Sequence, residues 1–266
     1  MIGINKGLAL KLLIKIACFT IFFTSLTVFL TTYILAVNDI VENPTRTENF
    51  VTLKMVTFQQ ISICEEDGCE TVSEIPDVSV IQASGMIVKS VYDKSYILTA
   101  DHFCEEFEKE SIIFSPTRIT FESILTVYEI AGEESSAEIV HRDPRLDLCL
   151  VEIDRASVDN IKIANTMPDY GETVYTISSP LGFSGDNFAI HLDGQFSGCY
   201  SMLDCYFSIP ARPGSSGSIV TNKKGEIIGM IQRAAPAVPF IAIGSNNQSI
   251  WMFLDEASNK TGVNLL

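Results

Sequence analysis

The chain is short of basic residues. It has 18 lysines and arginines against 33 aspartates and glutamates, and a net charge of −15 at neutral pH. Three of its lysines precede residue 16, so the remainder of the chain has a net charge of −18. Binding to nucleic acid needs basic patches, and adhesion to anionic lipid headgroups also needs positive charge. The composition therefore argues against nucleic acid as a partner and indicates a solvated acidic surface.

The sequence also lacks the cysteine spacing of a zinc site. Of the seven cysteines, Cys18 lies in an apolar N-terminal segment, which leaves six. Cys64 and Cys69, like Cys199 and Cys205, are farther apart than the two-residue spacing of a zinc knuckle. We expect neither a metal nor another cofactor. An even number of cysteines in an exported chain favours disulfides, and these two short spacings predict the bonds Cys64–Cys69 and Cys199–Cys205.

Charge is absent from residues 16–37, which follow the three N-terminal lysines. A helix of that length would extend about 33 Å, enough to cross the hydrocarbon core of a membrane. Basic residues before it and acidic residues after it predict a cytoplasmic N-terminus. We therefore predict that residues 1–37 are a cytoplasmic stub and a signal-anchor transmembrane helix. A polar tether would follow over residues 38–49, with residues 50–266 in the periplasm or outside the cell.

A cleaved signal peptide is the alternative for this segment, and it would give a secreted protein. The apolar core of a signal peptide is normally about 7–15 residues long and ends at small residues. Residues 16–37 exceed that length, and Ile34-Leu35-Ala36 is a poor cleavage site.

Residues 50–266 have the pattern of a β protein, without an internal repeat. Several segments are rich in β-branched and aromatic residues and are bounded by Gly or Pro. They predict strands over residues 51–63, 78–88, 112–127, 173–178, 206–209 and 227–232. Near the C-terminus, Ile250, Phe253 and Leu254 share one face of a short predicted helix over residues 249–257.

Three short motifs carry candidate chemistry. His102 follows an apolar strand, Asp147 opens another, and Ser216 lies in a Gly/Ser-rich turn. Taken singly, these are a surface histidine, a turn residue and an ordinary loop. The order His, Asp, Ser at strand ends is that of one catalytic design, in which Ser attacks, His accepts its proton and Asp orients the His. His141 and His191 lack such partners, and we expect structural or surface roles for them.

These motifs resemble those of the trypsin-like (chymotrypsin-fold) serine proteases, and most of all bacterial HtrA-type members. The matching residues are Leu98-Thr99-Ala100-Asp101-His102, Asp147-Leu148-Cys149-Leu150 and Gly214-Ser215-Ser216-Gly217-Ser218, supported by residues 171–182, 224–230 and 241–245. The resemblance covers about residues 50–258. It implies an all-β fold of two six-stranded antiparallel β-barrels, about residues 50–160 and 161–266, with a short C-terminal helix. The α/β-hydrolases do not fit, because their triad runs Ser, acid, His.

The resemblance implies a serine endopeptidase acting on polypeptides. Ser216 would be the nucleophile, His102 the base and Asp147 its orienting acid, with the N–H groups of Gly214 and Ser216 holding the oxyanion. A catalytically silent peptide-binding module of the same fold is the alternative. If His102 and Asp147 touch, the cysteines two residues beyond each of them are brought together, which predicts a third disulfide, Cys104–Cys149.

The chain departs from the family at several positions. Ser215 replaces the aspartate that activates digestive members. Because few residues follow the expected second barrel, we do not expect residues 50–266 to include the peptide-binding domain of HtrA-type enzymes. In the expected substrate pocket, Pro210 stands six residues before the nucleophile, no acid occurs in residues 206–215, and the far wall would be Ile231, Gln232 and Arg233. Burying an unpaired charge is costly. We therefore expect cleavage after uncharged, mostly apolar residues. The sequence does not indicate an oligomeric state.

Overall fold

The structure is a computed structural model that describes residues 23–29, 46–65, 68–105, 112–114, 116–156 and 160–266. The chain divides into two compact units, Met1–Asn43 and Pro44–Leu266. In the first unit, residues 23–29 are helical, with exposed apolar side chains such as Phe23 and Phe29. Most of the predicted membrane span lies outside the described residues. Within the ranges just given, no helix is both long enough and apolar enough to cross a membrane.

The second unit begins with a 3₁₀ turn, η1 (Thr47–Asn49), and a barrel of six antiparallel strands. The strands run in the order β1-β2-β3-β7-β6-β5, and a pairing of β1 with β5 closes the barrel. A short seventh strand, β4, lies beside β5. The bounds are β1 (Phe50–Glu65), β2 (Gly68–Val91), β3 (Lys94–Thr99), β4 (Ile112–Phe114), β5 (Thr117–Glu129), β6 (Glu134–Asp143) and β7 (Leu148–Ile153). The strand predicted over residues 112–127 is thus two strands, which form a hairpin around Pro116.

The second barrel is closed by six further strands in the order β10-β13-β12-β11-β8-β9. Their bounds are β8 (Thr173–Ser178), β9 (Ile190–Ser201), β10 (Asp204–Phe207), β11 (Ile219–Thr221), β12 (Ile227–Ala234) and β13 (Ala242–Asn246), with a 3₁₀ turn η3 (Pro180–Gly182) between β8 and β9. The predicted architecture of two six-stranded antiparallel barrels is confirmed.

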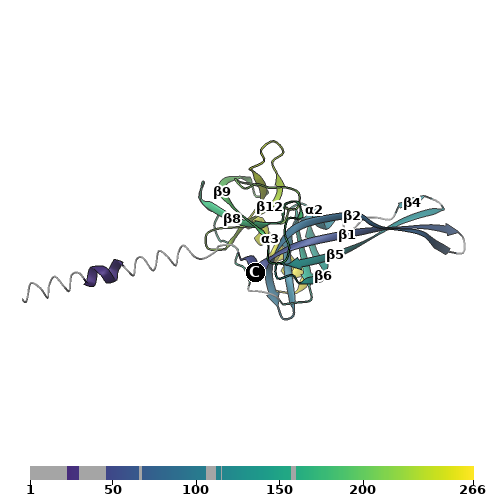
Figure 1. Ribbon diagram of the computed structural model, residues 1–266, viewed down its shortest axis with the longest axis horizontal. Helices are drawn as coiled ribbons and strands as arrows, with labels where there is room; N and C mark the ends of the chain where they lie inside the picture. Colours follow the sequence, from purple (N-terminus) through teal and green to yellow (C-terminus); the bar gives the residue numbers. More distant parts are fainter. Residues whose placement is uncertain (1–22, 30–45, 66–67, 106–111, 115, 157–159) are drawn as a thin grey trace, which may run out of the picture. The chain divides into compact units, whose positions relative to one another are not determined.

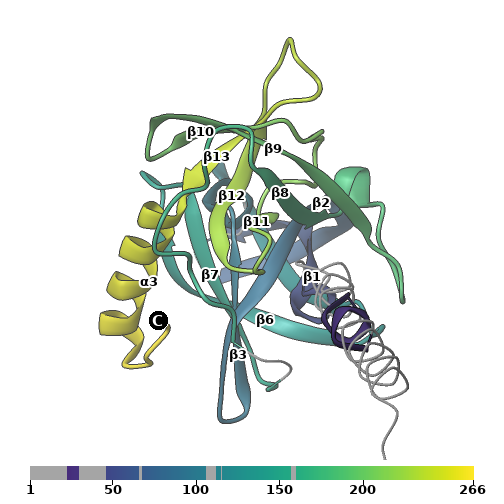
Figure 2. The same ribbon diagram turned by 90° about the vertical axis from the view of Figure 1, so that its left-hand side faces the viewer.

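The predicted C-terminal helix is also present, as α3 (Asn247–Thr261), and its ends follow from local sequence. The Asn246 side chain accepts the N–H of Ser249 at 3.0 Å, which satisfies a free donor of the first turn. Gly262 ends the helix in a left-handed conformation, with φ 73°. Ile250, Phe253 and Leu254 are buried as predicted, and α3 runs along the side of the barrels (Figure 2).

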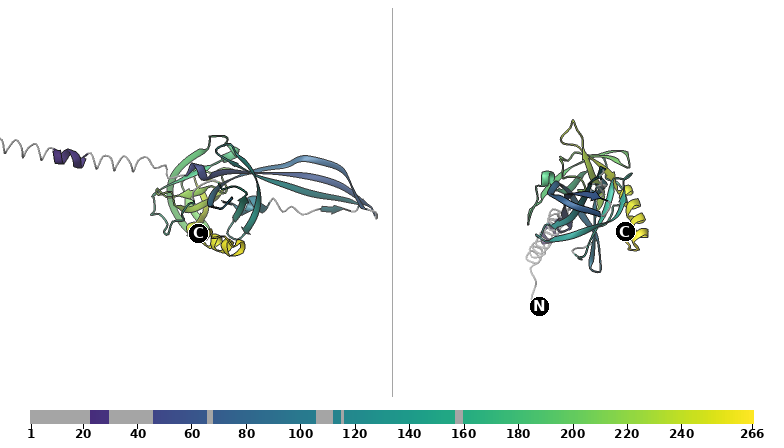
Figure 3. Two further views of the ribbon diagram at one scale, coloured as in Figure 1. Left: turned by 90° about the horizontal axis from the view of Figure 1, so that it is seen from below. Right: turned by 90° about the vertical axis from the view of Figure 1, so that its right-hand side faces the viewer.

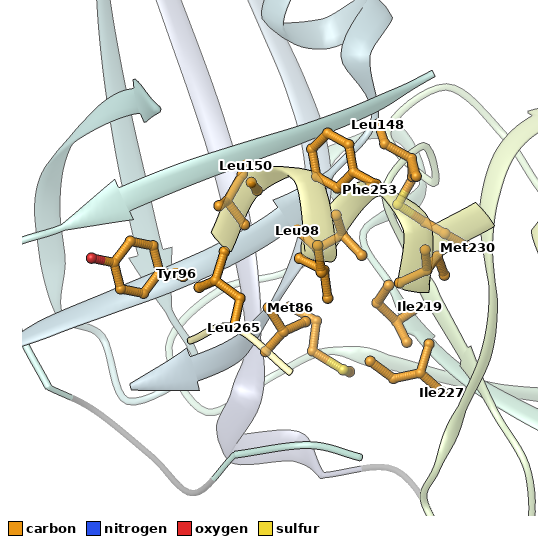
Figure 4. Packing of buried hydrophobic residues seen from close by; sticks show 14 of the residues in the cluster. Met86, Tyr96, Leu98, Leu148, Leu150, Ile219, Ile227, Met230, Phe253 and Leu265 are labelled. Carbon is orange, nitrogen blue, oxygen red and sulfur yellow. The ribbon is translucent and has the colours of Figure 1, made fainter. Parts of the chain in front are cut away.

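Three apolar clusters hold this unit together. One fills the first barrel and one the second. The third joins strands of both barrels to α3 (Figure 4), and its members include Leu98, Leu150, Met230 and Phe253. Burying one side chain of this size stabilises a fold by about 1.5–3 kcal/mol. Because the third cluster takes residues from both barrels, it fixes one barrel against the other, and with them any site that both contribute to.

Strands β1, β2 and β5 continue well past the first barrel as a long twisted extension (Figures 1 and 3). Within it, β1 pairs with β5 as far as Ile63 opposite Thr117, and the bond Cys64–Cys69 closes the turn from β1 to β2. The sequence predicted a β2 that starts ten residues later. Residues 68–77 carry acids and a proline instead of an apolar alternation, so the pattern does not reveal that they pair with β1.

Candidate active site

His102 is placed by a short helix, α2 (Asp101–Glu105), which begins just after β3. An ion pair and a disulfide connect this helix to neighbouring strands. Buried Asp101 accepts two hydrogen bonds from the Arg142 guanidinium on β6, at 2.7 and 3.2 Å. The disulfide Cys104–Cys149 joins α2 to β7, with Cα atoms 6.5 Å apart. His102 lies between these two ties, so its backbone is held on both sides.

Asp147 immediately precedes β7 and has a left-handed backbone conformation, with φ 52°. The turn before it is shaped by Asp143, which accepts the N–H groups of Arg145 at 2.9 Å and Leu146 at 3.3 Å. This turn directs the Asp147 carboxylate at His102. One oxygen accepts the His102 backbone N–H at 2.9 Å, and both oxygens lie 3.0 Å from Nδ1 of the ring.

The hydrogen bond that the His102 ring donates to Asp147 raises the pKa of His102 above its ordinary value. Burial opposes this shift, while the negative charges of Asp147, Asp101 and Glu105 add to it. The contact with a carboxylate also sets the tautomer, because the proton of the neutral ring is on Nδ1. Nε2 is then left with a lone pair, as a general base requires.

Ser216 lies in a turn that packs against the first barrel. The Ser84 N–H on β2 donates to the Ser216 carbonyl at 2.9 Å. Gly217 fits only as glycine, because a Cβ there would overlap the Ser84 carbonyl oxygen and the Thr99 hydroxyl, and its φ is +85°. Thr99 ends the strand that leads into His102. The turn therefore brings Ser216 to the same edge of the first barrel as His102.

The Ser216 hydroxyl donates to the backbone carbonyl of Gln232 at 3.2 Å. Across the described part of the chain, its hydrogen bonds do not include one to His102. Hydrogen bonds between catalytic groups are often long or misaligned before substrate binds. A serine hydroxyl changes partner by rotation about a single bond, without movement of the backbone.

The same turn contains the two N–H groups that were predicted to hold the oxyanion, those of Gly214 and Ser216. The Leu181 N–H donates to the Pro213 carbonyl at 2.6 Å. Because the C=O and N–H of a trans peptide point in opposite directions, this bond turns the Gly214 N–H away from Leu181. Ser84 Oγ donates to the next carbonyl, that of Gly214, at 2.8 Å. Within the described ranges, neither the Gly214 nor the Ser216 N–H has a protein acceptor.

The residues predicted to line a substrate pocket have different surroundings in the structure. Pro210 is exposed and Ile231 is fully buried. The Gln232 side chain points at the turn before β7, where its amide donates to the carbonyls of Leu146 and Asp147. Arg233 forms an ion pair with Asp204 from the β9–β10 hairpin. The sequence did not predict this ion pair, because only the folded second barrel brings residues 204 and 233 together.

The structure also shows where the predicted disulfides and His141 lie. The structure has all three expected disulfides, Cys64–Cys69, Cys104–Cys149 and Cys199–Cys205. His141 is buried and stacks on the Phe253 ring at 4.9 Å, a structural role like that expected. Sequence reasoning missed the supporting parts of the site: the Asp101–Arg142 ion pair, the Ser84 hydroxyl and the Gln232 amide. Each depends on a partner far away in the chain, which no local motif signals.

Known proteins resemble this chain in both sequence and fold. Residues 83–230 match the trypsin-like peptidase domain family. The serine protease Do-like HtrB of Bacillus subtilis is 27% identical over 219 residues, which cover 70% of this chain and 44% of that protein. A serine protease HtrA-like protein of Staphylococcus aureus is 26% identical over 162 residues, which cover 56% and 19%. The chain thus spans less than half the length of these relatives.

A solved structure shares the fold. The crystal structure of the serine endoprotease from Yersinia pestis superimposes with a TM-score of 0.58 at 18% identity, covering 81% of this chain and 64% of that one. The match in residues 83–230 includes His102, Asp147 and Ser216, and extends across both barrels. The chain belongs to the trypsin-like peptidase domain family.

Proposed function

We propose that this protein is a serine endopeptidase that cuts polypeptides with Ser216, His102 and Asp147. One observation carries the proposal. His102 Nδ1 lies 3.0 Å from the Asp147 carboxylate, and within the described ranges its Nε2 and the N–H groups of Gly214 and Ser216 have no protein partner. Acyl transfer needs a base, an oriented nucleophile and a site for the oxyanion.

In the proposed reaction, the Ser216 hydroxyl leaves the Gln232 carbonyl and donates to Nε2 of His102. Its oxygen attacks the scissile carbonyl carbon while Nε2 accepts the proton. The Gly214 and Ser216 N–H groups stabilise the oxyanion. The imidazolium, stabilised by Asp147, then gives its proton to the leaving nitrogen as the C–N bond breaks. Water, deprotonated by His102, releases the acyl group and restores Ser216.

The specificity that we propose is cleavage after uncharged, mostly apolar residues. Arg233 and Asp204 neutralise each other, so neither supplies a free charge to a substrate side chain. With no acid in residues 206–215, a substrate Lys or Arg would be buried without a partner. In an incubation of the purified protein with a peptide library, we expect cuts mostly after apolar residues. Cuts mostly after Lys or Arg would contradict this pocket, and peptide binding without cleavage would favour the silent-module alternative.

We also propose that the peptidase is tethered to a membrane, with the catalytic unit in the periplasm or outside the cell. The support is in the sequence: an uncharged segment over residues 16–37, lysines before it and disulfide-bonded cysteines after it. Expressed in a bacterium with the native N-terminus, the chain should stay in the membrane pellet after an alkaline wash. A variant that lacks residues 16–37 should not. Release of the intact chain by the wash would contradict the tether, and release of a shortened chain would indicate a cleaved signal.

A further inference from the structure

Gln232 stands out among the residues around the site, because its buried side chain contacts the catalytic acid's backbone. It lies on β12 and is 3% exposed. Its amide nitrogen donates to two consecutive carbonyls, those of Leu146 at 2.6 Å and Asp147 at 3.0 Å. One carboxamide therefore uses both of its N–H donors on the turn that carries the Asp147 carboxylate.

The turn has a reason to need this support. Asp147 has a φ of 52°, a left-handed conformation that non-glycine residues rarely adopt and that persists only where its surroundings fix it. Asp143 fixes the start of the turn by accepting the N–H groups of Arg145 and Leu146. Gln232 satisfies the carbonyls at its end. Without the Gln232 amide, the carbonyls of Leu146 and Asp147 would lose these hydrogen bonds, and the conformation of the turn would become less stable.

The same residue also contacts the nucleophile. The Gln232 backbone carbonyl accepts the Ser216 hydroxyl at 3.2 Å. Its neighbour Ile231 exchanges two backbone hydrogen bonds with the nucleophile turn, from Gly217 N–H and to the Ser218 carbonyl, each at 2.8 Å. Ser216 belongs to the second barrel and Asp147 to the first. Gln232 therefore joins the two halves of the site through one residue.

We propose that Gln232 is a positioning residue, which holds the Asp147 backbone in register with Ser216 so that His102 faces the nucleophile. This inference rests on the proposed triad. It assigns the Gln232 side chain to the catalytic acid instead of the substrate pocket. The two roles differ in their kinetic effect: a pocket residue changes KM, whereas a residue that positions the acid changes kcat.

The test is the exchange Gln232→Met in the full chain, because methionine has nearly the same shape and no N–H donors. We expect kcat for a library-derived peptide to fall about 10²-fold, the size of effect that a misplacement of about 1 Å produces, with KM unchanged. A misplaced Asp147 also supports less positive charge on His102, so the acidic limb of kcat/KM should move to lower pH. Gln60→Met, the same exchange on the β1 extension, should change neither. Gln232→Ala serves if the methionine variant does not fold.

A double-mutant cycle with Asp147→Asn separates this role from a general loss of stability. If Gln232 acts through Asp147, Gln232→Met should reduce kcat far less in the Asp147→Asn background than in the wild type. Equal losses in both backgrounds, or a rise in KM alone, would overturn the inference. A wild-type level of activity in Asp147→Asn itself would instead refute the proposed triad, so the two failures are distinguishable.

Discussion

Replacing Ser216 with Ala is expected to lower turnover by about 10⁶, the loss found when the nucleophile of a serine protease with an unrelated fold is removed. The variant keeps the oxyanion N–H groups and the His102–Asp147 pair, but it has no oxygen to attack the peptide carbonyl. A serine-reactive phosphonate probe should label the wild-type protein on Ser216 and leave the variant unlabelled. Peptide hydrolysis and the probe together measure the loss and the site.

Ser215→Ala is the matched control for that experiment. Ser215 is the neighbouring serine, buried to 1% exposure, and its Oγ accepts the Arg212 N–H inside the same turn. Losing one neutral hydrogen bond of this kind costs about 0.5–1.5 kcal/mol of stability, so we expect a small effect on turnover. If Ser215→Ala were as damaging as Ser216→Ala, or if the probe labelled another residue, the assignment of the nucleophile would be wrong.

Replacing Asp147 with Asn is expected to lower turnover by about 10⁴, the value for the same exchange in another member of this family. The amide keeps the shape of the carboxylate, but its NH₂ group can donate to Nδ1. The ring then has its proton on Nε2, where it cannot accept one from Ser216. The imidazolium also loses its counter-charge, so the His102 pKa should fall toward its ordinary value.

The pH dependence of the Asp147→Asn variant checks this explanation independently. In the wild type, His102 is protonated and inactive as a base below a pKa that Asp147 raises. The residual activity of the variant should therefore have its acidic limb at lower pH. Asp143→Asn is a control, since Asp143 supports the same turn through hydrogen bonds to Arg145 and Leu146 without contacting the His102 ring. An unshifted limb in Asp147→Asn would mean that Asp147 does not orient His102.

Local sequence was enough to single out the residues to which we assign the proposed chemistry. His102, Asp147 and Ser216 each follow or precede an apolar strand, and strand ends are recognisable from composition. The strands that escaped prediction include β6, which has charged or polar residues at most positions, and β9, which contains two glycines and alternates weakly. Their sequences look like loops, because these segments become strands only through pairing with neighbouring strands of their barrels.

The parts of the site that sequence could not predict all depend on distant pairing. Gln232 contacts residues 85 and 86 positions earlier in the chain, and Ser84 contacts Gly214 from 130 positions away. Arg233 forms its ion pair with Asp204, 29 positions earlier, because the β9–β10 hairpin places that aspartate beside it. Such contacts follow from how the barrels close and dock, and one sequence does not specify them in any local pattern.

The division of the site between two barrels has a consequence during synthesis of the protein. A ribosome makes the chain from the N-terminus, so His102 and Asp147 emerge well before Ser216, and Gln232 emerges later still. The first barrel on its own contains the proposed base and acid, His102 and Asp147, but lacks the proposed nucleophile, Ser216. If the proposed function is right, peptide cleavage begins only after the second barrel has been synthesised and has docked, and a half-made chain does not cut the proteins around it.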